Sequence, residues 1–291
     1  MKFAFIAAKQ GDFPVAWLCR RLEVSPSGFY RWLKAGEATR VSRDRQLGVM
    51  IRASHEASRG TYGSPRIHHE LATNGVRVGT KRVARLMREH GLSGLRPRRF
   101  RKTTDSQHAD AIADDLVKRD FAPKTSNTVW AADITDVRTW TGWLYLAVVI
   151  DLFSRRVVGW AIADHMRTEL VLTALDRAVQ ARCPAPGLVV HSDRGSQYAS
   201  RAHRAALKGQ GMLCSMSRKG NCWDNSVVES FFGTLKQELL YRRSWPTRDL
   251  TVDAIGDFID RFYNPRRRHS TLGYVSPIEY EMIAANERKA A

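Results

Sequence analysis

The hydrophobic pattern changes at residue 128, and this change divides the chain into two kinds of structure. Before it, apolar residues recur at the three- and four-residue spacing of amphipathic helices. After it, short runs rich in Val, Ile, Leu and Trp alternate with helical stretches, which is typical of strands separated by helices. A fold built from one type of element is therefore excluded, and we expect helical modules followed by an α/β domain.

The second part of the chain predicts strands and helices in the order β-β-β-α-β-α-β-α. Its first two strands are joined by a hairpin turn at residues 140–143. Alternation follows, so we expect a five-stranded mixed sheet flanked by helices. The expected strands are 129–135, 143–151, 157–162, 188–193 and 212–216, and the expected helices are 168–181, 200–210 and 225–236. We assign four tryptophans to the core, namely Trp130, Trp140, Trp143 and Trp160.

Two helix-turn-helix patterns precede the sheet. In the first, Ser25-Pro26 begins the second helix, and in the second, Ser64-Pro65 and Thr80 begin the two helices. Such a motif places its second helix in the major groove of DNA, where cations neutralise phosphates. For one helix alone, a solvated surface is an equal alternative. The expected DNA contacts are Lys81, Arg82, Arg85 and Arg88, with Arg96, Arg98 and Arg99 in the basic linker that follows.

The net charge of +18 is concentrated in the same helical part. Residues 1–105 hold 22 Lys and Arg against 8 Asp and Glu, which leaves the rest nearly balanced. Such an excess indicates a polyanionic partner, with nucleic acid favoured over an anionic membrane. No apolar run approaches the roughly 20 residues that span a bilayer, and the cysteine spacing fits neither a zinc site nor a disulfide framework. We therefore expect a cytoplasmic protein with reduced, mostly buried thiols, associated with the nucleoid when bound to DNA.

These patterns predict four regions. They are an N-terminal helix-turn-helix at 1–40, a second helix-turn-helix module with its basic linker at 41–105, a linker at 106–126, and an α/β core with a helical tail at 127–291. In the tail, the basic run 266–269 has two equal interpretations, as a DNA contact or as the end of a helix. A last helix is expected to begin at Pro277.

Three carboxylates of the α/β region stand where a binding site is expected. Asp133 lies inside the first apolar strand, where a charge is costly unless it has a partner or a function. Asp193 follows the fourth strand, at the sheet edge where α/β proteins bind ligands, and Glu229 lies on the helix after the fifth strand. Oxygen ligands alone favour Mg²⁺ or Mn²⁺ over zinc. Two such ions, about 3.5–4 Å apart, would assist phosphoryl transfer.

The spacing of these residues strengthens the hypothesis. Asp193 and Glu229 are separated by 35 residues, and Lys236 follows Glu229 by seven. Seven helical residues return a side chain to within about 20° of its starting direction, so Lys236 and Glu229 share a helix face. A cation beside a metal-binding face would hold a DNA strand.

This arrangement resembles the D-D-35-E signature of retroviral integrases and related transposases, which have an RNase H-like fold. The chain is more closely similar to transposases of the bacterial insertion-sequence family three, specifically to the product of their second reading frame. The matching stretches are 62–66, 130–135, 191–198, 220–236 and 263–269. The resemblance implies that Asp133, Asp193 and Glu229 are catalytic ligands of Mg²⁺, and that Lys236 contacts DNA. It also implies cleavage at element ends and joining of a 3′ hydroxyl to another strand.

The resemblance further implies a set of partners. These are the terminal repeats of the element, a target DNA, a second copy of the chain in a synaptic complex, and the product of the upstream reading frame. The zinc-binding His/His/Cys/Cys module of retroviral integrases is missing, since His68 and His69 are adjacent and have no partner cysteines. Two other functions are kept as alternatives, a non-enzymatic helix-turn-helix regulator and an RNase H-like nuclease that does not join strands.

Overall fold

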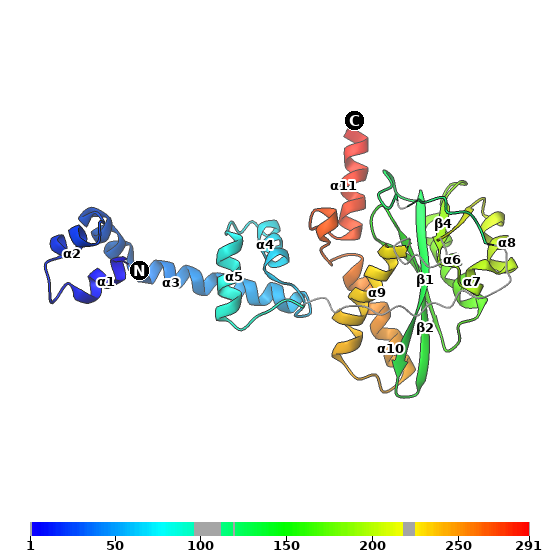
Figure 1. Cartoon of the computed structure of the whole chain (residues 1–291), viewed down its shortest axis with the longest axis horizontal. Helices are drawn as coiled ribbons and strands as arrows, with labels where there is room; N and C mark the ends of the chain where they lie inside the picture. The colour runs from blue at the N-terminus through cyan, green and yellow to red at the C-terminus, as the bar shows by residue number, and fades with distance from the viewer. Residues whose placement is uncertain (1, 96–111, 119, 218–224, 291) are drawn as a thin grey trace. The chain divides into compact units, whose positions relative to one another are not determined.

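The computed structural model describes residues 2–95, 112–118, 120–217 and 225–290. The chain divides into two compact units, Met1–Gly94 and Leu95–Ala291, whose elements are labelled in Figure 1. Within the expected linker, residues 112–118 lie along the sheet of the second unit. There, the Met216 N–H donates to the carbonyl of Asp114, and the Leu116 N–H donates to Ser215 Oγ. Among the described residues, no helix combines the length and apolar character needed to cross a membrane.

The first unit begins with a small cluster formed by three helices, α1 (Lys2–Lys9), α2 (Val15–Arg21) and α3 (Pro26–Ala57). Ser25 caps α3, because its Oγ accepts a hydrogen bond from the Gly28 N–H at 3.0 Å. Ile6, Leu18 and Phe29 are buried together, one from each helix. The expected helix start at Ser25-Pro26 is confirmed, but α3 continues through the predicted division at residue 40.

The last turns of α3 pack against α4 (Ser64–Thr73) and α5 (Thr80–Glu89). This second cluster buries Leu47 and Ile51 of α3, Ile67 and Leu71 of α4, and Val83, Leu86 and Met87 of α5. Asn74-Gly75 ends α4 as expected, with Gly75 at a positive φ of 77° that glycine adopts without strain. The helical pair predicted from the sequence is therefore confirmed.

The described residues of the second unit form a five-stranded sheet of order β3-β2-β1-β4-β5. The strands are β1 (Val129–Thr139), β2 (Gly142–Asp151), β3 (Val157–Ala163), β4 (Val189–Ser192) and β5 (Leu213–Met216). Strands β1, β2 and β3 pair antiparallel, whereas β1–β4 and β4–β5 are parallel. The predicted mixed sheet is confirmed, and β1 extends four residues beyond its expected end.

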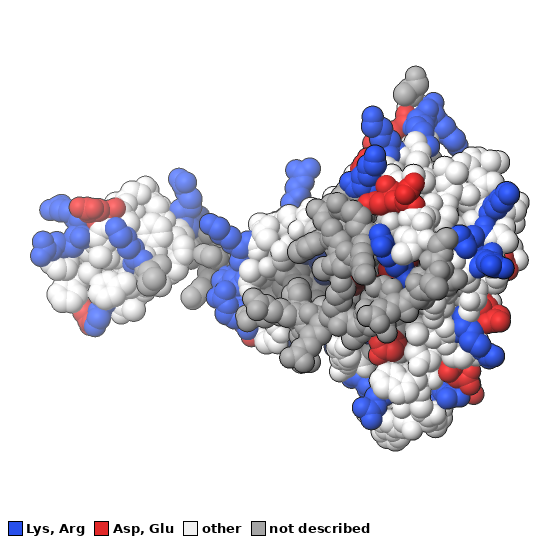
Figure 2. All heavy atoms as spheres, turned by 45° about the vertical axis from the view of Figure 1, so that its right-hand side comes forward, with Lys and Arg blue, Asp and Glu red and all other residues white. Residues whose placement is uncertain are grey.

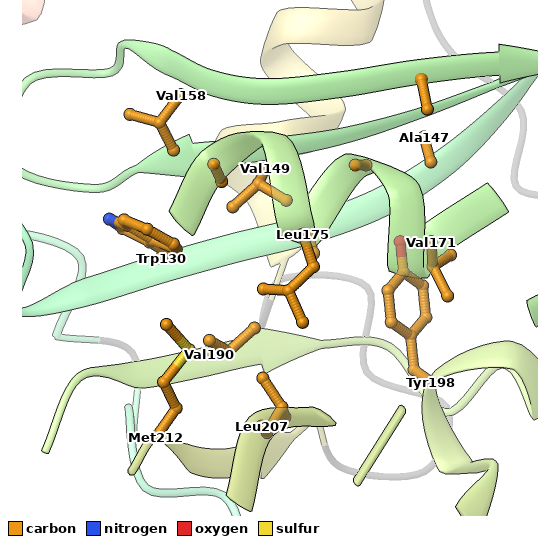
Figure 3. Packing of buried hydrophobic residues seen from close by; sticks show 14 of the residues in the cluster. Trp130, Ala147, Val149, Val158, Val171, Leu175, Val190, Tyr198, Leu207 and Met212 are labelled. Carbon is orange, nitrogen blue, oxygen red and sulfur yellow. The ribbon is translucent and has the colours of Figure 1, made fainter. Parts of the chain in front are cut away.

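Helices cover both faces of this sheet (Figure 1). On one face, α6 (Thr168–Arg182), α7 (Ser196–Ala199) and α8 (Arg201–Gly209) enclose an apolar core with Trp130, Val149 and Val190 (Figure 3). On the other, α9 (Ser226–Glu238) contacts β1. The tail comprises a 3₁₀ turn (Leu240–Arg242), α10 (Arg248–Gly256), a π-helical segment (Asp257–Tyr263), a second 3₁₀ turn (Ser270–Leu272) and α11 (Pro277–Ala290).

Helix α6 approaches β3 most closely at Gly159. A Cβ atom on this residue would lie 2.7 Å from Cβ of Ala178 and would also overlap the carbonyl oxygen of Ala174. The position of a Cβ atom is fixed by the backbone, so no side-chain rotation can relieve its clash with the backbone oxygen of Ala174. The contact between α6 and the sheet therefore requires glycine at this position.

Two of the tryptophans assigned to the core are exposed. Trp130 is fully buried, but Trp140 is 75% exposed and Trp143 is 46% exposed. The reason is the length of the β1–β2 hairpin, because β4 pairs only with the first four residues of β1. The tip of the hairpin therefore extends past the neighbouring strand. Trp160 is partly buried, and the expectation of mostly buried thiols fails at the exposed Cys183.

A group of partly buried ionic side chains around the buried Asp151 attaches α11 to the sheet. Arg182 on α6 donates two hydrogen bonds to Glu281 of α11 at 2.8 and 2.9 Å, and its Nη2 lies 3.4 Å from Asp151 Oδ2. Glu281 also accepts from Arg156 at 2.8 Å and from Ser154 at 2.7 Å. Burial raises the pKa of Glu281, but the hydrogen bonds from Arg182, Ser154 and Arg156 outweigh it and leave the pKa below its usual value.

Replacing Arg182 by methionine should lower the free energy of unfolding by about 3 kcal/mol, because it leaves the buried carboxylates of Asp151 and Glu281 without this cation. Urea denaturation measures the change. Arg261→Met is the matched control, since Arg261 is 84% exposed on its side chain and its pair with Asp257 is a surface contact, for which we expect less than about 0.5 kcal/mol. Equal losses in both variants would contradict the structural role of Arg182.

Candidate active site

The parallel pairing of β1 with β4 brings two aspartates to the same place. Ala132 is the last residue of β1 that pairs with β4, and its partner Ser192 is the last residue of β4. Asp133 and Asp193 directly follow these two paired residues in the chain, and neighbouring strands of a sheet lie about 4.8 Å apart. Side chains alternate between the faces of a sheet. Because Ala132 faces the core under α6, both aspartates belong to the opposite face.

Helix α9 lies on that opposite face and carries Glu229 in its first turn. Val228, Phe232 and Leu235 are buried, as the sequence predicts, and Phe231 is buried with them. The apolar side of α9 thus packs on the sheet and fixes the direction of the helix. A helix N-terminus carries partial positive charge, which favours a carboxylate in its first turn.

The three carboxylates influence one another electrostatically. Burial raises the pKa of Asp133 well above its usual value, and the negative charge of Asp193 raises it further, as does that of Glu229. A hydrogen bond from the Ile134 N–H to Asp133 Oδ1, at 2.8 Å, and the charge of Lys236 act in the opposite direction. The carboxylate of Asp193 accepts the Gly195 N–H at 2.9 Å. The fold therefore gathers the predicted acidic residues into one electrostatic group.

The donor set suits a hard divalent cation. Three carboxylates offer only oxygen, which Mg²⁺ and Mn²⁺ prefer, and like charges at close range repel unless positive charge is supplied. Within the described ranges, no three acidic, histidine or cysteine side chains are gathered closely enough to enclose a metal ion. The three carboxylates thus have the chemistry of a magnesium site but not the closed geometry of one.

Lys236 occupies a different environment from the one expected of a DNA contact. It is only 9% exposed, and its Nζ lies 3.5 Å from Asp136 Oδ1 on β1. Its charge also lowers the pKa of Asp133. Lys236 shares the site with Glu229, as the seven-residue spacing predicts, but its ammonium is directed toward carboxylates of this chain.

The cations predicted on α5 fall into two groups. Arg82 and Arg85 both bind Asp44 of α3, each at 2.7 Å, and Arg85 also binds Glu89 at 2.7 Å. Lys81 and Arg88 are exposed. Arg82 and Arg85 are therefore engaged in ion pairs within the chain, which the sequence analysis missed because Asp44 is distant in sequence.

The surface charge of the described residues follows the sequence pattern. Lys and Arg stand out along the N-terminal helices with few acidic neighbours on the visible face, whereas both signs mix on the core (Figure 2). Three further predicted DNA contacts, Arg96, Arg98 and Arg99, lie outside the described residues.

The basic run of the tail serves the fold at two of its positions. Arg267 forms two hydrogen bonds to Glu238 at the end of α9, at 2.7 and 2.9 Å, and both side chains are buried. Arg268 donates to the carbonyl of Tyr274 at 2.7 Å. These contacts are structural, but neither of them caps a helix end, so they match neither interpretation of the run in full. The pair with Glu238 also holds the end of the helix that carries Glu229.

Sequence reasoning also missed Asn225, the residue before α9. Its Nδ2 donates to the carbonyl of Ala132, the residue before Asp133, at 3.3 Å. The available signals were its position four residues before Glu229 and its place in the matching stretch 220–236, and neither distinguishes it from an ordinary helix cap.

Replacing Asp133 by asparagine should stabilise the protein in a buffer with a metal chelator. A folded-state pKa above the unfolded value means that the ionised form weakens folding at neutral pH. Asparagine removes that charge, and we therefore expect the free energy of unfolding to increase at neutral pH. The gain should disappear as the pH falls toward about 4, where the carboxyl group is neutral.

Urea denaturation at several pH values measures this gain. Asp176→Asn, at an exposed position of α6, is the control and should change stability little at any pH. A loss of stability in Asp133→Asn at pH 8 would show that the carboxylate is not under electrostatic strain.

The chain matches two kinds of protein family. Residues 123–222 and residues 210–277 each match an integrase core domain, and residues 42–100 match an HTH-like domain. The 31 kDa protein of insertion element IS600 from Shigella sonnei is 43% identical over 272 residues, which cover 92% of this chain and 100% of that protein. Transposase InsF for insertion sequence IS3A from Escherichia coli (strain K12) is 38% identical over 285 residues, 97% of this chain and 98% of that protein.

Among solved structures, the catalytic core domain of BIV integrase is similar, with a TM-score of 0.42 and 18% sequence identity. The similarity covers 56% of this chain and 99% of that one. The five-stranded mixed sheet agrees with the integrase-core matches in sequence. With relatives that match almost end to end, these findings show that the chain belongs to the IS3 family of insertion-sequence transposases.

Proposed function

We propose that this chain cleaves DNA strands at the ends of an insertion sequence and joins the resulting 3′ hydroxyl to a target strand. The observation that carries the proposal is the β1–β4 register, which leaves Asp133 and Asp193 side by side on the face that α9 covers. Glu229 in the first turn of α9 completes the set. Membership of a transposase family with an integrase core supports phosphoryl transfer on DNA as the type of reaction.

In this proposal Asp133, Asp193 and Glu229 are the catalytic residues and hold Mg²⁺, with two ions expected and Mn²⁺ as a substitute. Bound ions of this kind make a water or a 3′ hydroxyl more acidic and stabilise the leaving oxygen. Hydrogen bonds from the backbone at Ile134 and Gly195 orient the two aspartates. Lys236 remains a proposed DNA contact, and its charge, which lowers the pKa of Asp133, would also offset that of the carboxylates.

The helical unit is proposed to hold DNA. Lys81 and Arg88 are exposed on α5 and would contact phosphates. Arg96, Arg98 and Arg99, outside the described residues, are proposed as further phosphate contacts from the sequence. Arg82 and Arg85 would bind phosphate only if they gave up their ion pairs with Asp44. The proposed DNA partners are the terminal repeats and a target duplex. Because two ends must be brought together, we propose a homo-oligomer, with the upstream reading-frame product as a further partner.

Asp193→Asn should abolish Mg²⁺-dependent cleavage and joining while DNA binding persists, because the change removes a metal ligand and leaves the helical unit intact. The assay supplies a duplex that carries the element end, a labelled target duplex and Mg²⁺. It scores cleaved and joined products on a gel, with binding measured by mobility shift. Asp176→Asn, the same substitution at an exposed position of α6, should retain full activity.

The same assay separates the alternatives. Cleavage without joined product in the unmodified protein would favour a nuclease. Binding without either product would favour a regulator. Full activity in Asp193→Asn would exclude this residue from the catalytic set.

Lys81→Ala and Arg88→Ala should each weaken DNA binding and reduce the slope of log K against log salt by about 1, because each variant removes one phosphate contact. Fluorescence anisotropy with a labelled duplex between low and moderate salt measures both quantities. Arg261→Ala, at an exposed position of the tail, should leave the slope unchanged. An unchanged slope in both α5 variants would remove this helix from the DNA interface.

A further inference from the structure

Asn225 connects the helix of Glu229 to the strand of Asp133. It immediately precedes α9, and it is 6% exposed. Its side chain forms no capping bond to the helix. Instead its Nδ2 donates to the carbonyl oxygen of Ala132 at 3.3 Å. The contact lies where β1 and β4 stop pairing, one residue before each aspartate.

The chemistry of this contact fixes the orientation of the amide. A backbone carbonyl can only accept a hydrogen bond, so the group that faces it must be the NH₂ group of Asn225. The oxygen Oδ1 then points away from that carbonyl. If Asn225 served only to attach α9 to β1, its NH₂ group would be sufficient.

The oxygen of the same amide is buried, and within the part of the chain that the structure describes it has no hydrogen-bond partner. A buried acceptor without a donor costs about 1–3 kcal/mol. Native proteins rarely retain such an atom unless water, an ion or a ligand supplies the missing partner. In contrast, the equally buried Asn264 has both ends of its amide satisfied, because Oδ1 accepts from the Val157 N–H and Nδ2 donates to the Val157 carbonyl.

We propose, on the basis of the function proposed above, that Asn225 is a positioning residue of the metal site. Its Nδ2 holds the start of α9 against β1 beside Asp133, and its Oδ1 would be an acceptor for a water molecule of the cation that Asp133, Asp193 and Glu229 would hold. An amide is suited to this position, because it supplies an acceptor without adding a fourth negative charge to three repelling carboxylates.

The test is calorimetric titration of the full chain with Mn²⁺, which measures metal affinity without any catalytic step. Asn225→Ala should weaken Mn²⁺ binding by about tenfold, as is typical when a group that supports metal ligands is removed. Asn264→Ala is the matched control, since it deletes an equally buried amide away from the aspartates. It should lower the melting temperature but leave the Mn²⁺ affinity within about twofold of the unmodified value. Unchanged affinity in folded Asn225→Ala overturns the proposal.

Asn225→Asp tests the acceptor Oδ1 separately from the Nδ2 bond to Ala132, and it keeps the shape of the side chain. The carboxylate cannot donate to the Ala132 carbonyl, but it retains an oxygen that accepts from bound water. We expect its Mn²⁺ affinity to equal or exceed that of the unmodified protein. A loss of about tenfold relative to the unmodified protein would mean that only the Nδ2 bond to Ala132 matters, and would overturn the role of Oδ1. This variant decides the question even where Asn225→Ala does not fold.

Asp193→Asn in the same titration separates this proposal from the proposed function. If the unmodified protein binds Mn²⁺ and Asp193→Asn does not, the metal site is established and the Asn225 variants test only the further inference. If the unmodified protein binds no Mn²⁺, the proposed metal-dependent function fails, and the role of Asn225 fails with it.

Discussion

Parallel pairing between β1 and β4 is the contact on which the site depends. These strands are far apart in the chain, and β2, β3 and α6 lie between them, so the pairing forms only when the chain has crossed back over the sheet. It sets two aspartates at the same level and on the same face. A shift of one residue in β4 would turn Asp193 toward the apolar core under α6. Register therefore decides whether the acidic group exists.

The surroundings of the acidic residues distinguish the site from the structural ion pairs. Glu238 and Glu281 each bind an arginine through two hydrogen bonds and stabilise the packing of the tail. Burial raises the pKa of Asp133, and the charges of Asp193 and Glu229 raise it further, against the opposing charge of Lys236. The fold thus gathers acidic side chains at one point of the sheet. The carboxylates that only stabilise folding are each paired with an arginine instead.

Much of this organisation follows from local sequence pattern. The strands, α6 and α9 were predictable because their apolar periods are long and regular, and the three carboxylates because their spacing matches a known signature. What failed depends on distant partners. The exposure of Trp140 and Trp143 follows from how short β4 is, and the pairing of Arg82 with Asp44 joins α5 to a helix far earlier in the chain. The bond from Asn225 to Ala132 is of the same kind, since it needs the sheet and α9 to be assembled first.

The contact at Gly159 limits how this family of folds can vary. The distance between α6 and β3 is set there by backbone atoms, whereas elsewhere in the core it is set by side chains that can exchange volume with their neighbours. A larger residue at Val149 or Leu175 can be accommodated by a smaller one nearby. No second change can make room at Gly159, because the clashing oxygen belongs to the main chain of α6. Position 159 must therefore remain glycine, whereas other positions of the core can change together.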